Sequence, residues 1–133
     1  MNEMKLEILT PEKCVADVNI SSLYLEGSMG RLGILPGHTA LISQLEFGLL
    51  EMETNSGKEK MLCGKGLVEV AHDKVTVLVR SAESGKDIDV ERAKAALTRA
   101  KSRRDSKDKD VDMTRAELAL YRAIQRMSFV GGK

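Results

Sequence analysis

The residues with the clearest chemical potential are arginines that recur at helical spacing in the last third of the sequence. Two sets of three arginines repeat the same steps of seven and four residues: Arg92, Arg99 and Arg103, then Arg115, Arg122 and Arg126. Such steps keep side chains on one side of an α-helix. If two helices pair antiparallel here, some guanidinium groups come close together, and a bound anion would relieve their repulsion. The alternative is a pair of solvated basic faces, with Asp89 and Arg92 as an ordinary i,i+3 pair worth about 0.3 kcal/mol.

A second candidate is the segment GRLGILPGHTAL, residues 30–41, which combines three glycines, a proline and a histidine. Its glycines form neither G-x-x-x-x-G-K-[ST] nor G-x-G-x-x-G, so a phosphate-binding loop is not expected. The segment instead favours a tight turn, a corner fixed by Pro36 and a following strand. His38 has no serine or cysteine arranged beside it as a nucleophile, and His72 is expected to be solvated in a turn. We therefore expect a docking edge or a plain loop rather than a catalytic turn.

The other reactive residue types show no catalytic or metal-binding spacing. Cys14 and Cys63 match no metal or redox motif, which predicts two reduced packing residues. Because no nucleophile–base pair or metal-ligand cluster is present, we expect a protein that is not an enzyme. Apolar residues make up 42% and charged residues 31%, as in a soluble globular chain. No apolar run approaches the ~20 residues of a membrane span, and the N-terminus lacks the pattern of a secretory signal.

The net charge of +1 hides an asymmetry between the two parts of the chain. Residues 1–84 carry 8 Lys and Arg against 12 Asp and Glu, a net charge of −4, whereas residues 85–133 carry 13 against 8, a net charge of +5. A basic C-terminal part predicts an acidic target, which is a nucleic acid, a nucleotide or a protein. An RNA-binding arm on a small β-domain is thus one alternative, although aromatic residues are only 3% and leave little for base stacking.

Residues 1–84 read as a series of short strands separated by turns. Apolar and charged residues alternate around Met4–Ile8, Leu50–Glu53 and Val75–Val79, and Asn55-Ser56-Gly57 marks a turn. Leu9 and Leu78 interrupt strict alternation, as expected where both faces of a strand are covered. This spacing predicts an all-β sandwich or barrel.

Residues 85–133 change to a helical period after Ser84-Gly85. Apolar residues recur at steps of three and four over 88–104 and over 112–129, which predicts two amphipathic helices. Acidic residues, Asp87 among them, gather at the first helix's start, and Asp110 or Asp112 is expected to cap the second. The short polar link predicts an antiparallel hairpin. Because the helices contain seven alanines but only three leucines, we expect a weakly packed hairpin that can open and extend.

Several segments in order resemble the epsilon subunit of rotary F-type ATP synthases. GRLGILPGHTAL is similar to the family's G-x-L-G-[IV]-L/Y-P-x-H-x-x-L signature, and MKLEILTPEK, GLVEVAHDKVTVLV and DVDMTRAELALYRA resemble its first strand, a later strand pair and its second helix. The family often has an acidic residue where this chain has Arg31. The resemblance implies an α+β chain: an N-terminal β-sandwich domain over 1–84, followed by a two-helix hairpin over 85–133.

The same resemblance implies a regulatory ATP site. Ile88-Asp89-Val90-Glu91-Arg92-Ala93 matches the I/L-D-x-x-R-A motif with which some bacterial epsilon subunits bind ATP. Further residues stand where the family places additional ligands: Glu83, Arg99, Arg122 and Arg126. Asp89 would accept a hydrogen bond from the adenine amino group or cap the helix, and the arginines would bind phosphates. No metal ligand is implied.

The resemblance also implies the partners and location of the chain. The β-domain would clamp the gamma subunit and sit on the c-ring, with Arg31 and His38 on the ring-facing edge. The opened helices would reach the alpha/beta catalytic hexamer and restrain ATP hydrolysis through Arg103, Arg104 and Arg115. The chain would then be a non-catalytic, regulatory subunit on the cytoplasmic face of the bacterial plasma membrane, peripheral to the membrane and without a nucleic-acid partner.

Overall fold

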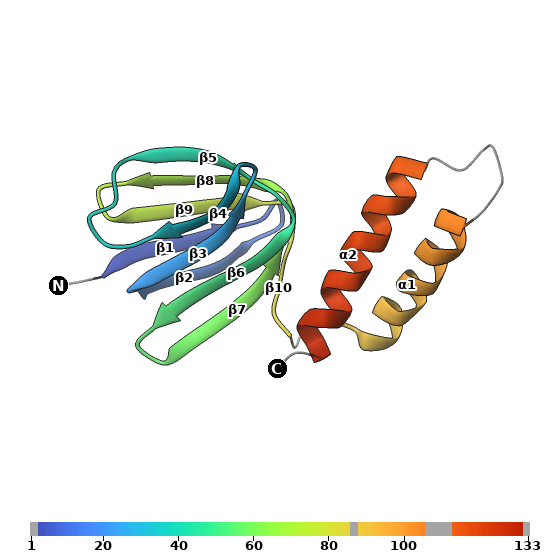
Figure 1. Cartoon of the computed structure of the whole chain (residues 1–133). Coiled ribbons are helices and arrows are strands. Elements are labelled where there is room, and N and C mark those ends of the chain that lie inside the picture. The colour runs from blue at the N-terminus through green and yellow to red at the C-terminus, as the bar shows by residue number, and fades with distance from the viewer. Residues whose placement is uncertain (1–2, 86–87, 106–112, 132–133) are drawn as a thin grey trace. The chain divides into compact units, whose positions relative to one another are not determined.

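The chain divides into two compact units, residues 1–84 and 85–133. The computed structural model describes residues 3–85, 88–105 and 113–131. The first unit is built from strands and the second from helices (Figure 1). The predicted fold class, a β-sandwich or barrel followed by a two-helix hairpin, is confirmed.

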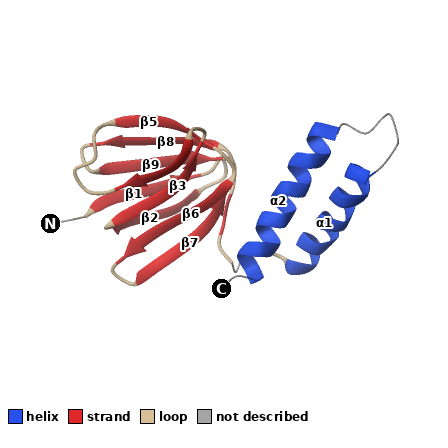
Figure 2. Ribbon diagram, in the orientation of Figure 1, coloured by secondary structure: helices blue, strands red, loops and turns tan. Residues whose placement is uncertain are grey.

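The described part of the first unit forms ten strands. They are β1 (Met4–Leu9), β2 (Cys14–Ile20), β3 (Ser22–Gly27), β4 (Gly30–Ile34), β5 (Leu41–Leu45), β6 (Gly48–Thr54), β7 (Gly57–Cys63), β8 (Gly66–Ala71), β9 (Lys74–Val79) and β10 (Ala82–Glu83). Their order in the sheet is β10-β7-β6-β3-β5-β8-β9-β1-β2, and β4 pairs with β3 outside this path. Neighbours run antiparallel except β1 and β9, which run parallel. The sheet curls until β2 lies near β6, which gives a nearly closed barrel (Figure 2).

The core of this barrel follows from the alternation in the sequence. Met4, Leu6 and Ile8 on β1 are at most 2% exposed, while Lys5 and Glu7 between them face outward. Valines 75, 77 and 79 on β9 are buried in the same way, and Leu6 pairs with Val75 across the parallel pair of strands. Burial of each such side chain contributes about 1.5–3 kcal/mol.

Of the two interruptions of the alternation, Leu9 is half-buried, whereas Leu78 departs from the expectation. Leu78 is 44% exposed, so the expectation that both faces of its strand are covered is wrong for this residue. Its side chain points to the outer face because its neighbours Val77 and Val79 fill the core. There Leu78, Leu9 and Pro11 line an open hollow of about 460 Å³, together with Lys65 and Arg80.

The second unit is a hairpin of α1 (Val90–Asp105) and α2 (Met113–Gly131), which lie side by side and run antiparallel (Figure 1). The seam between them is lined by small residues, as expected: Ala93, Ala100, Ala116, Leu120 and Ala123 are at most 6% exposed. Ala93 and Ala100 are seven residues apart on α1, and Ala116 and Ala123 are seven residues apart on α2. Because the helices are antiparallel, this equal spacing lets Ala93 face Ala123 and Ala100 face Ala116. An alanine methyl contributes only about 0.8 kcal/mol on burial, so this seam holds the helices weakly.

Asp89 begins the first helix as its N-cap. Its carboxylate Oδ1 accepts a hydrogen bond from the amide of Arg92 at 3.1 Å, and its carbonyl oxygen accepts one from the amide of Ala93 at 2.9 Å. Such a cap stabilises a helix by about 1 kcal/mol. The expected contribution of Asp87 to this helix start, and the expected capping of the second helix by Asp110 or Asp112, lie outside the described residues.

Candidate functional site

Six of the seven arginines of the hairpin lie on one face of it. At 100° per residue, Arg92, Arg99 and Arg103 point within roughly 40° of one another, about a quarter turn from the buried seam of α1. Arg115, Arg122 and Arg126 point about a quarter turn from the seam of α2, in the same rotational sense. Because the two helices run antiparallel, side chains that are rotated from the seam by the same angle and in the same sense lie on the same side of the hairpin. We call this surface the arginine face and define it by these residues: Arg92, Arg99, Arg103, Arg115, Arg122 and Arg126.

The acidic side chains described on the helices point away from the arginine face. Glu117, the one acidic residue within α2, lies on the opposite side of that helix, about 200° around the axis from Arg115. On α1, Glu91 pairs with Lys94 at 4.0 Å on the side away from the arginines, and the carboxylate of Asp89 is occupied in capping. The arginine face gathers six guanidinium groups, and this donor geometry suits an anion with several oxygens, such as a polyphosphate.

Three residues of the predicted ATP-binding motif, Ile88-Asp89-Val90-Glu91-Arg92-Ala93, stabilise the hairpin itself. Ile88 is 7% exposed and Ala93, which lies in the seam, is 5% exposed. Asp89 is exposed, and its carboxylate caps the start of α1. Only the side chain of Arg92 is exposed and directed to the arginine face. The motif thus starts a helix and sets the position of one arginine.

The remaining candidate ligands differ in their placement. Arg99 and Arg122 are exposed and Arg126 is half-buried, all on the arginine face. Arg104 lies off this face, and its Nε pairs with its neighbour Asp105 at 3.1 Å. Glu83 belongs to β10 in the first unit, where it pairs with Leu62 of β7.

Arg31 is held within its own domain. On β4, its Nη2 lies 2.8 Å from Oε1 of Glu51, while its Nη1 lies 3.4 Å from Oε1 of Glu26 and donates to the carbonyl oxygen of Leu49 at 3.2 Å. The three charged side chains are about one-third to two-fifths exposed. Sequence reasoning missed these partners because they come from β3 and β6. The guanidinium therefore ties the β4 arm to the sheet.

The glycines around Arg31 shape this arm. Gly30 has a φ of 124° and ends the two-residue turn Ser28-Met29 that joins β3 to β4. The ring of Tyr24 covers Gly33 so closely that a Cβ there would lie 2.8 Å from its Cε1. The segment is therefore a β-hairpin arm and a corner, as expected.

His38 lies in the corner that follows β4. Its ring Nδ1 is 2.6 Å from the carbonyl oxygen of Thr39, and its amide donates to the carbonyl oxygen of Leu35 at 3.0 Å. His72 is exposed in the β8–β9 turn, as expected.

The two cysteines are free thiols in different surroundings. Cys14 is exposed, whereas Cys63 is buried. Burial, and secondarily the charge of Glu83, raises the pKa of the Cys63 thiol from 9.0 to about 12. Such a thiol stays protonated and unreactive at neutral pH. Among the residues that the structure describes, no group of three or more His, Cys, Asp and Glu side chains is arranged to hold a metal ion.

Comparison with known proteins covers both units. Residues 3–85 match the family model of the ATP synthase delta/epsilon chain beta-sandwich domain, and residues 86–131 match that of the delta/epsilon chain long alpha-helix domain. The ATP synthase epsilon chain of Carboxydothermus hydrogenoformans is 42% identical over 77% of this chain and 76% of its own. That of Anoxybacillus flavithermus is 39% identical over 80% of each chain.

Solved structures share the fold. A chain in the cryo-EM structure of the Euglena gracilis mitochondrial ATP synthase OSCP/F1/c-ring aligns with a TM-score of 0.81 at 24% identity, covering 92% of this chain and 78% of that one. A chain in the central stalk/c-ring structure from Tetrahymena thermophila aligns with a TM-score of 0.56 at 17% identity, covering 97% and 94%. Within the described residues, neither helix has the length and apolar character needed to cross a membrane.

Proposed function

This chain belongs to the ATP synthase delta/epsilon family, and on that premise we propose that it couples the rotor of the enzyme and restrains its ATP hydrolysis. It is an epsilon chain, a non-catalytic subunit of the complex. The β-domain docks on the gamma subunit and the c-ring of the central stalk, and the helical hairpin is a regulatory element that senses ATP. The complex lies on the cytoplasmic face of the bacterial plasma membrane. The RNA-binding alternative is set aside, since it explained the same basic helices without a family to support it.

The outer face of the barrel offers a surface for gamma. Ile42 on β5, Leu67 on β8 and Leu78 on β9 are 68%, 42% and 44% exposed. These strands are neighbours, and Leu67 lies directly opposite Leu78. Exposed apolar side chains grouped in this way are typical of protein interfaces.

The β4 arm and the following corner are the proposed contact with the c-ring. The family often has an acidic residue at the position of Arg31, yet the cluster here keeps a negative charge. Arg31 carries +1, while Glu26 and Glu51 within 3.4 Å carry −2 together, which leaves a net charge of −1. The substitution thus preserves the sign of the charge at this edge, and His38 lies at the end of the same segment.

The hairpin restrains ATP hydrolysis by opening into an extended arm. With 16 residues in α1 and 19 in α2, the helices placed end to end span about 52 Å at 1.5 Å per residue. The arginines of an extended arm, Arg103, Arg104 and Arg115 among them, would meet acidic surfaces of the alpha/beta hexamer. The alanine-lined seam that holds the hairpin shut is weak, so the closed and open forms lie close in free energy.

ATP biases this balance by binding the closed hairpin. The arginine face, with arginines from both helices, is the observation that carries this proposal, because such a face exists only while the helices are paired. At one hundred times its dissociation constant, ATP would stabilise the closed form by about 2.7 kcal/mol. That amount is comparable to the burial energy of the four seam alanine methyl groups, about 3.2 kcal/mol.

The test is titration of the full-length chain with ATP by calorimetry. Arg92→Ala and Arg122→Ala remove one guanidinium from each helix, and we expect each to weaken binding at least about tenfold, the loss of one charge-assisted contact. Lys94→Ala is the matched control, since it removes one positive charge from the opposite side of α1. Absence of heat with the unaltered chain, or equal weakening by all three variants, contradicts the ATP site.

A further inference from the structure

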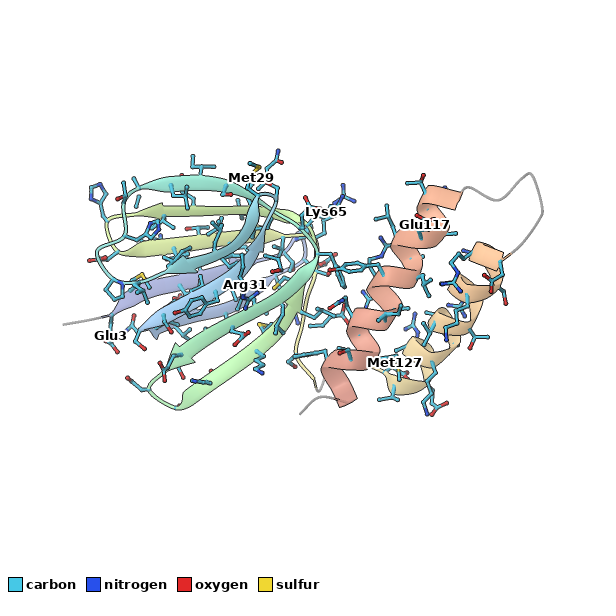
Figure 3. The ribbon with its side chains drawn as sticks, in the orientation of Figure 1. Glu3, Met29, Arg31, Lys65, Glu117 and Met127 are labelled. Carbon is cyan, nitrogen blue, oxygen red and sulfur yellow. The ribbon has the colours of Figure 1, made fainter. Side chains whose placement is uncertain are left out.

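The tip of the β3–β4 arm carries a fully exposed thioether. Met29 is 97% exposed and occupies the second position of the Ser28-Met29 turn (Figure 3). The flanking Gly27 and Gly30 pair across the base of this turn and have no side chains that could shield it. The amide of Ser28 donates to the carbonyl oxygen of Gln44 at 3.1 Å, which anchors the tip on β5. The sulfur is thus held outward on an ordered turn.

The other methionines described with their side chains are protected. Met4, Met52 and Met61 are 2%, 6% and 8% exposed in the barrel core, and Met127 on α2 is half-buried. Susceptibility of a thioether to oxidation follows its exposure to solvent. The ratio of exposures, 97% against 8% or less, predicts oxidation of Met29 about tenfold faster than that of the core methionines.

The geometry points to Met29 as an oxidation site, at which a peroxide converts the thioether to the sulfoxide. The O–O bond of hydrogen peroxide breaks as one oxygen forms a bond to the sulfur. The sulfur is oxidised by two electrons, and the peroxide is reduced to water. The product places a polar, chiral S=O group at the tip of the arm in place of an apolar end, and methionine sulfoxide reductase reverses the change. The site rests on the exposure of Met29 in the separate chain, whereas the function proposed above brings the same arm to the c-ring, so the inference is made for the chain outside the complex.

The test is exposure of the folded chain to dilute hydrogen peroxide, followed by trypsin digestion and mass spectrometry. A Cys14→Ser background removes the exposed thiol, which would also gain oxygen. Cleavage after Lys and Arg separates four methionines into different peptides, residues 14–31 for Met29, 32–58 for Met52, 61–65 for Met61 and 127–133 for Met127.

In the folded chain we expect the peptide of Met29 to gain one oxygen about tenfold faster than those of Met52 and Met61. In denaturant the rates should become equal, which shows that the fold and not the local sequence sets the difference. Met29→Leu should abolish the rapid phase, whereas Met61→Leu should leave it unchanged. Equal rates for Met29 and Met52 in the folded chain, or a rate for Met29 that rises on unfolding as theirs does, would overturn the inference.

Discussion

The amide of Gly37 donates a hydrogen bond of 2.8 Å to the carboxylate Oδ1 of Asp73. This bond joins the corner after β4 to the β8–β9 turn, and both lie in segments that resemble the family. Gly37 and Asp73 have φ values of 83° and 58°, in the left-handed region. The carbonyl oxygen of Asp73 also accepts a bond of 2.9 Å from the amide of Lys5. Asp73 thus fixes the corner that holds His38 and ties the turn to β1.

Asp73→Ala should lower the free energy of unfolding by about 2–3 kcal/mol, through loss of the bond to Gly37 and the strain of alanine in the left-handed region. Asp73→Asn retains an acceptor oxygen and tolerates the left-handed backbone, so it should cost less than about 0.5 kcal/mol. Urea unfolding of the three chains measures both values. If alanine and asparagine cost the same, the side-chain bond does not stabilise the corner.

Two glycines in the barrel should respond differently to one added methyl group. A Cβ at Gly66 would lie 1.8 Å from the backbone carbonyl oxygen of Leu78, so Gly66→Ala requires the β8–β9 pair to separate. A Cβ at Gly33 meets only the ring of Tyr24, which can shift. We expect Gly33→Ala to cost about 1–3 kcal/mol and Gly66→Ala to cost more. Thermal unfolding followed by circular dichroism compares them, and a Gly66→Ala chain as stable as Gly33→Ala would show that the pair yields.

The buried thiol of Cys63 should make stability fall at high pH. Its pKa is raised from 9.0 to about 12 in the folded chain, so only the unfolded chain ionises between these values. The stabilising contribution is complete below pH 9 and is lost as the pH rises toward 12, by at most about 1.4 kcal/mol per pH unit. Unfolding free energies of the unaltered chain and of Cys63→Ala, measured from pH 8 to 11, should converge. Parallel curves would mean that Cys63 ionises equally in both states.

Local patterns in the sequence predict most of this fold, because alternation and helical period are local properties. Met4, Leu6 and Ile8 are buried as expected, and the alanine seam forms where the helical period places it. Which strands pair with each other is not a local property of the sequence. The parallel pairing of β1 with β9 joins residues about seventy positions apart, and no local pattern indicates it.

The sequence predicts the arginine face about as well as it predicts the fold. The steps of seven and four residues place the arginines on one side of each helix, and the antiparallel hairpin then brings both sets to one face. The partners of Arg31 and the bond between Gly37 and Asp73 required the structure, because they depend on strand register. The family resemblance is confirmed, whereas the roles of Arg31, His38 and the arginine face in partner and ATP binding remain predictions.

If the hairpin must open to restrain ATP hydrolysis, a hairpin that is locked shut cannot restrain it. Ala100 and Ala116 are each 3% exposed in the seam, on facing helices, and we choose these positions for a disulfide that locks the hairpin shut. Ala100→Cys with Ala116→Cys, in a Cys14→Ser background, is assembled into the complete ATP synthase. Cys63 is retained because its buried thiol does not react.

The measurement is the rate of ATP hydrolysis by this complex at low ATP concentration, oxidised and then reduced with dithiothreitol. The account predicts faster hydrolysis with the hairpin locked and a return to the slower, restrained rate after reduction. Each single cysteine variant should show no change between the two conditions. Equal rates before and after reduction of the double variant, at every ATP concentration, would contradict the account.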